Sequence, residues 1–137
     1  MNKLLATLSL ALLLAAPAGY AGDVVLIGNG NVPKIDAETA VRLYTGRAIQ
    51  VAGVNVTPVN LKSGVRLRGQ FLADLLGMDE ERYVAYWTVR RYIGKGAPPR
   101  ELEGSAEVIG YVQSTPGAIG YIDSSELKPG LNVVLKR

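Results

Sequence analysis

The stretch Thr115-Pro116-Gly117-Ala118-Ile119-Gly120-Tyr121 decides how this chain folds. Pro116 ends the helical pattern that precedes it, and residues 117–122 then read as a short, mostly apolar strand. Glycine weakens the interior of a strand unless another group must approach the backbone closely. Gly117 and Gly120 therefore predict a buried strand with a neighbour or a ligand against its backbone.

Helical and strand patterns alternate on both sides of this stretch. Four helices are predicted, and the residues expected to cap their N-termini are Asp36, Ser63, Asp79 and Ser105. Short strands are predicted at residues 24–27, 59–61, 117–122 and 133–135, with a hairpin or edge strand from residue 49. On the third helix, Tyr83, Val84 and Trp87 are expected to face the core. Strands separated by helices indicate the α/β class, with a small sheet and about four helices around it.

The first residues have the three parts of an export signal. Lys3 is basic, residues 4–16 are apolar, and small residues lead to Ala21. The apolar run is shorter than the ~20 residues that span a bilayer as a helix. We predict that residues 1–21 are a signal peptide and that residues 22–137 form one domain in the periplasm.

Composition excludes several kinds of active site. The chain has no histidine and no cysteine, which excludes Ser-His-Asp and Cys-His nucleophile systems as well as thiolate or imidazole zinc sites. We therefore expect a binding protein without enzyme activity, cofactor or metal. The formal net charge is only +3, and basic residues are spread along the chain without a dense run, so no nucleic-acid partner is expected.

The segment from Lys62 to Arg68 lies between a predicted strand and a predicted helix, where free backbone N–H groups and the positive end of the helix dipole meet. Ser63 adds a hydroxyl donor, Gly64 lets a ligand approach the backbone, and Lys62 or Arg66 supplies a positive charge. The segment predicts a site for a small oxyanion. The alternative, in which Ser63 only caps the helix and Gly64 only makes a turn, remains open.

Several motifs resemble, in order and spacing, the phosphate-binding proteins of ABC transporters, within the type II periplasmic binding protein superfamily. They are Tyr44-Thr45-Gly46-Arg47, Ser63-Gly64 at a helix start, Phe71, Trp87, Gly94-Lys95-Gly96 and Thr115-Pro116-Gly117-Ala118-Ile119-Gly120-Tyr121. The resemblance covers residues 23–127. It implies a periplasmic protein of this superfamily, and the chain length implies a single lobe, similar to the second lobe of the family, with a small mixed sheet.

The resemblance also implies a phosphate site at the helix start, where the family has a Ser-Gly-Thr motif and an arginine a few residues before it. The residues implied in ligand binding are Lys62, Ser63, Gly64, Val65 and Arg66, and Asn29 from a loop that lies near the hinge in full-length relatives. Two features depart from the family. Val65 replaces the threonine, and residues 59–61 contain no arginine, so one hydroxyl and one bidentate cation are missing.

Two functions follow from these observations. In the first, the chain recognises phosphate or another small oxyanion, in phosphate uptake or sensing, with a membrane permease or a sensor as partner. In the second, the chain has lost ligand binding and is a non-catalytic protein that docks on a sensor, a transporter or another envelope component. We expect the first function; the second is the alternative, and the loss of the threonine and the arginine favours it.

Overall fold

The computed structural model describes residues 22–136, so the predicted signal peptide lies outside the described residues. A mixed sheet lies between helices on its two faces, which confirms the α/β class. The strands are β1 (Val24–Gly28), β2 (Gln50–Val51), β3 (Val54–Asn55), β4 (Thr57–Leu61), β5 (Arg100–Leu102), β6 (Ala118–Asp123) and β7 (Asn132–Lys136). The helices are α1 (Ala37–Tyr44), α2 (Arg66–Phe71), the π-helical turn η1 (Leu72–Leu76), α3 (Glu80–Tyr92), α4 (Ser105–Ser114) and the short 3₁₀ turn η2 (Ser124–Glu126).

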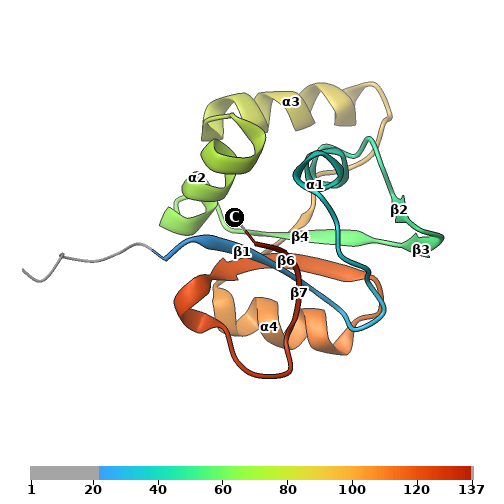
Figure 1. Ribbon diagram of the computed structural model, residues 1–137. Helices are drawn as coiled ribbons and strands as arrows, with labels where there is room; N and C mark the ends of the chain where they lie inside the picture. The colour runs from blue at the N-terminus through green and yellow to red at the C-terminus, as the bar shows by residue number, and fades with distance from the viewer. Residues whose placement is uncertain (1–21, 137) are drawn as a thin grey trace, which may run out of the picture.

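The main sheet has the strand order β5-β4-β6-β1-β7. Strand β4 pairs in parallel with β5 and β6, whereas β1 runs antiparallel to both of its neighbours, β6 and β7. Strands β2 and β3 form a separate hairpin. Figure 1 shows α4 on one face of the main sheet, with α1 and α2 on the other and α3 beyond them at the outer end of the molecule. The sheet is therefore the middle of three layers.

Both glycines of the opening motif meet a close neighbour, as predicted. A Cβ at Gly117 would lie 2.1 Å from the carbonyl oxygen of Asn55, and the residue has φ +78. A Cβ at Gly120 would lie 2.6 Å from Val108 on α4 and 2.9 Å from Val59 on β4. The neighbours are the chain's own backbone and side chains, so these glycines serve the packing of β6.

Two of the four predicted helix caps are confirmed. The carboxylates of Asp36 and Asp79 each accept a hydrogen bond of 2.8 Å from a backbone N–H in the first turn of α1 and α3. The predicted caps at Ser63 and Ser105 are wrong, because Val65 and Gly104 occupy the N-cap positions. At Ser63 the reason is local: the chain continues through a turn before α2 begins, and the serine hydroxyl binds a side chain on α3 instead.

Strand β5 is absent from the strands that the sequence predicts. Arg100 and Glu101 are charged and exposed, and only Leu102 is buried, so the segment has too few apolar residues for a strand pattern. Its place comes from pairing with β4 at the edge of the sheet, where Asn60 is opposite Glu101. Backbone pairing at an edge does not require apolar side chains on both faces.

Aromatic rings and hydroxyls fill the core between the sheet and helices α1 to α3. Phe71 stacks on Tyr121 with ring centroids 3.9 Å apart and meets Tyr44 edge to face at 4.7 Å. Each buried hydroxyl has a partner: that of Tyr44 donates to the carbonyl of Val59, and that of Tyr83 donates to the carbonyl of Tyr44. Burial raises the pKa of Tyr83 to about 12, so its hydroxyl stays protonated at neutral pH.

The prediction for the core face of α3 is correct for two residues of three. Tyr83 and Trp87 are buried, whereas Val84 is 49% exposed.

Among residues 22–136, no helix has the length and apolar character that crossing a membrane requires.

Candidate functional site

The predicted oxyanion site lies at the end of the sheet where the parallel strands β4, β5 and β6 have their C-termini. Residues 62–65, which we call the Ser63 turn, connect β4 to α2. The N–H of Lys62 donates to the carbonyl of Leu102, at the end of β5, over 3.0 Å. The carboxyl ends of parallel strands in α/β sheets commonly form ligand sites, so the position itself suits binding.

A carboxylate of the chain itself occupies the polar groups of this turn. The Ser63 hydroxyl donates to Oε1 of Glu80 over 2.6 Å. Arg68 donates from Nε to Oε2 and from Nη2 to Oε1 of the same carboxylate, each over 2.9 Å. Glu80 therefore accepts hydrogen bonds from a hydroxyl and from a bidentate guanidinium. A bound phosphate would need these same donors.

Arg68 is the centre of this arrangement. Its side chain is only 6% exposed, and Nη1 donates both to the carbonyl of Leu61, over 2.9 Å, and to Oε2 of Glu101, over 2.7 Å. Its guanidinium also lies over the Tyr83 ring, 5.5 Å from the centroid. Every nitrogen of the guanidinium thus has an acceptor within the chain.

The pKa of Glu80 reflects the same contacts. Partial burial by itself raises the pKa of this carboxyl, but the hydrogen bonds from Arg68 and Ser63 together outweigh burial and lower the pKa below its ordinary value. Glu80 therefore carries its negative charge at neutral pH. A second anion at the Ser63 turn would meet this charge directly.

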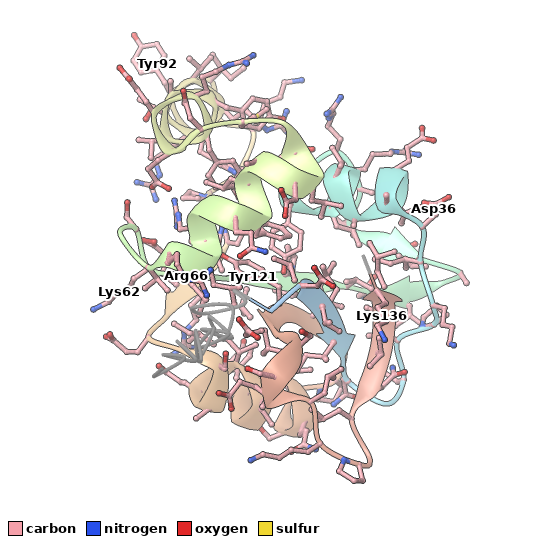
Figure 2. The ribbon with its side chains drawn as sticks, turned by 60° about the vertical axis from the view of Figure 1, so that its left-hand side comes forward. Asp36, Lys62, Arg66, Tyr92, Tyr121 and Lys136 are labelled. Atoms are coloured by element: carbon pink, nitrogen blue, oxygen red, sulfur yellow. The ribbon has the colours of Figure 1, made fainter. Side chains whose placement is uncertain are left out.

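The two cations predicted for the site have carboxylate partners as well. Lys62 forms an ion pair of 2.6 Å with Glu103, and hydrogen bonding to that carboxylate raises the pKa of the lysine. Arg66 lies 3.5 Å from Asp123 and also donates to Gln70. Both basic side chains are largely exposed, and Figure 2 shows Lys62 pointing away from the domain. Exposed pairs of this kind contribute little to stability.

The backbone of the turn is partly open. Gly64 has φ +90, and a Cβ there would have nothing within 4 Å, so its backbone is accessible. The N–H of Val65, in contrast, donates to the carbonyl of Lys62 over 3.2 Å. Of the predicted donors, the Gly64 backbone is the one that the structure leaves most open to solvent.

Asn29 does not join the Ser63 turn. It follows β1, which runs antiparallel to β6, and its backbone N–H donates to Ala118 at the start of β6. The turn lies near the other end of β6, where Arg66 meets Asp123. The length of β6 separates the two places by about 16 Å, at roughly 3.3 Å per strand residue. The Asn29 side chain instead donates to the carbonyls of Val112 and Gln113, which joins β1 to α4.

Sequence reasoning missed three residues that decide the chemistry of the turn: Arg68, Glu80 and Glu101. The family motif has its arginine before the turn, whereas Arg68 reaches the turn from α2, which follows it. Glu80 comes from a separate element, where it follows the N-cap of α3. Arg68 precedes the apolar Phe71 and Leu72 by three and four residues, and this place on the apolar face of the helix is the signal that could have indicated an internal carboxylate partner.

The charge balance of the turn is unfavourable for an anion. Three cations gather there, Lys62, Arg66 and Arg68, and the ion pairs bring four carboxylates to them: Glu80, Glu101, Glu103 and Asp123. The described residues contain no group of three or more acidic side chains placed to hold a metal ion. Each of the four carboxylates pairs with a basic side chain, so the turn as a whole does not attract negative charge.

A groove lies beside this cluster, between α3, the loop of residues 94–99 and β5. It has a volume of about 500 Å³ and a mainly apolar lining. Trp87, Tyr83 and Pro98 contribute apolar surface, and Arg68 and Glu101 form the wall shared with the Ser63 turn. Volumes of this size are typical of binding sites for small molecules and for anchoring side chains of partner proteins.

No family model matches the chain, and no curated protein matches it. Several solved structures are similar to the chain. A phosphate ABC transporter substrate-binding protein from Clostridium perfringens, with bound phosphate, is similar with a TM-score of 0.63 and 19% identity, over 82% of this chain and 44% of that one. An ABC-type phosphate transport receptor from Vibrio cholerae is similar with a TM-score of 0.63 and 13% identity, over 82% and 45% of the two chains.

PstS from Borrelia burgdorferi is similar in the same way, with a TM-score of 0.61, 18% identity and coverage of 82% of this chain and 46% of that one. The chain has the fold of one periplasmic-binding-protein lobe. It spans less than half the length of these solved proteins, so the lobe corresponds to one part of each of them. The expected fold, a single lobe with a small mixed sheet, is thereby confirmed.

Proposed function

We propose that the lobe is a non-catalytic docking protein of the periplasm that does not hold free phosphate at the Ser63 turn. The observation that carries the proposal is the Glu80 carboxylate, which accepts from the Ser63 hydroxyl and from two nitrogens of Arg68. An external anion would have to displace the Glu80 carboxylate, which the chain itself holds at these donors. Because a tethered group has a high effective concentration, millimolar phosphate competes poorly with it.

The kind of function is supported by the fold and the composition. The structural neighbours are binding proteins, and a chain without histidine and cysteine lacks the Ser-His-Asp and Cys-His nucleophile systems and imidazole proton shuttles. We place the lobe in the periplasm because of its predicted export signal. Its partner in this proposal is a membrane permease, a sensor or another protein of the envelope, bound through the groove beside Trp87.

The groove supplies the contact surface for such a partner. Trp87 and Tyr83 are almost fully buried and form the rigid floor of the groove, held in place by packing and by the Tyr83 hydrogen bond to Tyr44. Val84, Pro98 and Pro99 also line the groove, and Val84 is 49% exposed. A partly enclosed apolar pocket with a rigid floor suits an anchoring side chain inserted by a partner protein.

Phosphate titration tests the state of the Ser63 turn. For the purified protein we expect no saturable heat of binding with millimolar phosphate in calorimetry. Glu80→Gln should reveal weak binding, with a dissociation constant in the millimolar range, because it removes a negative charge and frees donors of Arg68 and Ser63. About 4 kcal/mol of binding free energy corresponds to that range.

Glu81→Gln is the matched control, since this neighbouring carboxylate on α3 is exposed and forms no ion pair among residues 22–136. It should leave the titration unchanged. Micromolar binding of phosphate by the unmodified protein, lost in Ser63→Ala, would contradict the proposal and establish the oxyanion function instead.

Oxyanion recognition is the second candidate, and the open backbone at Gly64 favours it. A phosphate there would approach the exposed N–H groups of Ser63 and Gly64, with charge from Arg66, whose pairing with Asp123 is long at 3.5 Å. One of the structural neighbours carries bound phosphate, which adds support. The lobe would then act in phosphate uptake or sensing, and the titration above separates the two candidates.

Photocrosslinking tests the docking surface. A benzophenone amino acid in place of Thr88, at the rim of the groove, should yield one dominant crosslinked protein in whole cells of the source organism. The same amino acid in place of Gln113, on α4 across the sheet, is the control and should not yield that product. Equal crosslinking from both positions, or none from Thr88, would rule out the groove as the docking surface.

A further inference from the structure

The C-terminal end of α3 and the following loop form a protruding tip, two residues of which, Arg91 and Tyr92, also line the groove described above. All residues from 91 to 98 are exposed. Tyr92 is 90% exposed, Val89 is 60% exposed and Ile93 is 56% exposed, which are large values for apolar side chains. Figure 2 shows Tyr92 projecting from the outermost part of the molecule. We call Val89, Arg91, Tyr92, Ile93 and Lys95 the α3 tip.

The sequence around the tip has one sign of charge. Residues 82–100 contain five basic residues and no acidic residue, although the whole chain has a formal net charge of only +3. Arg90 turns inward, where it donates to the carbonyl of Gly46 and lies over the Trp87 ring, 5.6 Å from the centroid. Arg91 and Lys95 remain outside, and neither forms an ion pair among residues 22–136.

Exposed aromatic and aliphatic side chains between unpaired cations are the chemistry of a membrane-surface contact. Tyrosine partitions into the headgroup layer of a bilayer, and cations beside it are attracted to anionic lipids. The tip offers only a few exposed side chains, whereas a protein partner usually needs about 800 Å² of complementary surface on each side. Such a tip suits shallow insertion among lipid headgroups better than docking on a protein.

We propose that the α3 tip docks the lobe on an anionic phospholipid surface, with Tyr92 and Ile93 in the headgroup layer and Arg91 and Lys95 against lipid phosphates. The inference does not rest on the state of the Ser63 turn, to which no residue of the tip belongs, but Arg91 and Tyr92 also line the groove of the proposed function. Lipid binding is therefore tested with vesicles and protein docking by crosslinking at Thr88, so that each can fail without the other. Two cations and two apolar side chains support weak, reversible binding, since each cation near an anionic surface strengthens it only about fivefold.

Vesicle co-sedimentation with the full protein tests the inference. We expect binding to vesicles of phosphatidylglycerol and phosphatidylethanolamine, release by high salt, and little binding to phosphatidylcholine vesicles. The double variant R91Q/K95Q should bind the anionic vesicles at least tenfold more weakly. Y92S/I93S should also bind them more weakly, because it removes the side chains that enter the headgroup layer.

The matched control is K34Q/K128Q, which makes the same change in net charge at two exposed lysines outside α3 and its loop. It should bind the anionic vesicles like the unmodified protein. If R91Q/K95Q and K34Q/K128Q lost vesicle binding to the same extent, the binding would depend on net charge alone, and the inference would be overturned. Absence of binding to anionic vesicles would overturn it as well, including the case in which an acidic protein binds the tip instead.

A second measurement reports insertion directly. Tyr92→Trp places an indole at the tip, and its fluorescence should shift to shorter wavelength when anionic vesicles are added. The protein with Trp87 alone should show no such shift, because Trp87 is only 6% exposed. An unshifted Tyr92→Trp spectrum on vesicles that sediment the protein would contradict insertion of the tip.

Discussion

Arg68→Met is expected to lower the free energy of unfolding by about 3 kcal/mol, at the lower end of the range for breaking a buried ion pair. Methionine keeps much of the packing volume but removes all five donors. The carboxylates of Glu80 and Glu101 would then face each other without the guanidinium, and the carbonyl of Leu61 would lose its side-chain donor. Urea unfolding followed by circular dichroism measures the change.

Arg66→Met is the control, because Arg66 lies two residues earlier on the same helix, is 62% exposed and pairs only loosely with Asp123. It should change the free energy of unfolding by less than about 0.5 kcal/mol. Arg68→Lys should recover only part of the loss, since an ammonium group cannot hold two carboxylates and a carbonyl in the same fork. Equal effects of Arg68→Met and Arg66→Met would show that the buried network does not stabilise the lobe.

Gly117→Ala is expected to destabilise the lobe by at least about 3 kcal/mol, through left-handed strain and overpacking together. The added methyl would meet the carbonyl oxygen of Asn55 at 2.1 Å, and that oxygen belongs to the backbone of the segment leading into β4. The carbonyl of Gly117 accepts from the N–H of Thr57, and its N–H donates to Asn31, so the residue cannot move without breaking these bonds.

Gly130→Ala separates the two contributions. Gly130 also has positive φ, +90, but a Cβ there meets nothing within 4 Å. It should therefore lose only about 1 kcal/mol, the strain of the backbone conformation alone. A Gly117→Ala protein that fails to fold while Gly130→Ala folds would agree with the expectation. Similar stabilities of the two variants would refute the close contact at Gly117.

The sequence predicted the layers of the fold because local signals and burial agree there. The Pro-Gly start of β6, the caps at Asp36 and Asp79, and the αL glycine at the end of η1 each have a local cause that can be read in a single window. Strand β5 could not be predicted in this way. Its residues are mostly charged, and only pairing with β4, whose partner residues come 41 positions earlier, makes it a strand.

The Ser63 turn illustrates a second limit. Its residue types are correct for an oxyanion site, and the structure places Lys62, Ser63, Gly64 and Arg66 where a strand, β4, leads into a helix, α2, as predicted. The sequence around the turn does not contain the partners of its side chains, because Glu80 and Glu101 come from other elements. A set of donors indicates a ligand only when the rest of the chain leaves those donors free.

The position of β1 in the middle of the sheet has a consequence for how the chain reaches its native state. Its two neighbours are about 100 residues away in sequence, so this central strand stays unpaired until β6 and β7 have been synthesised, and loop closure of this length slows folding. In a nascent chain the main sheet therefore lacks its centre until then. Slow closure of this kind keeps the chain unfolded for longer, which suits the export predicted from residues 1–21.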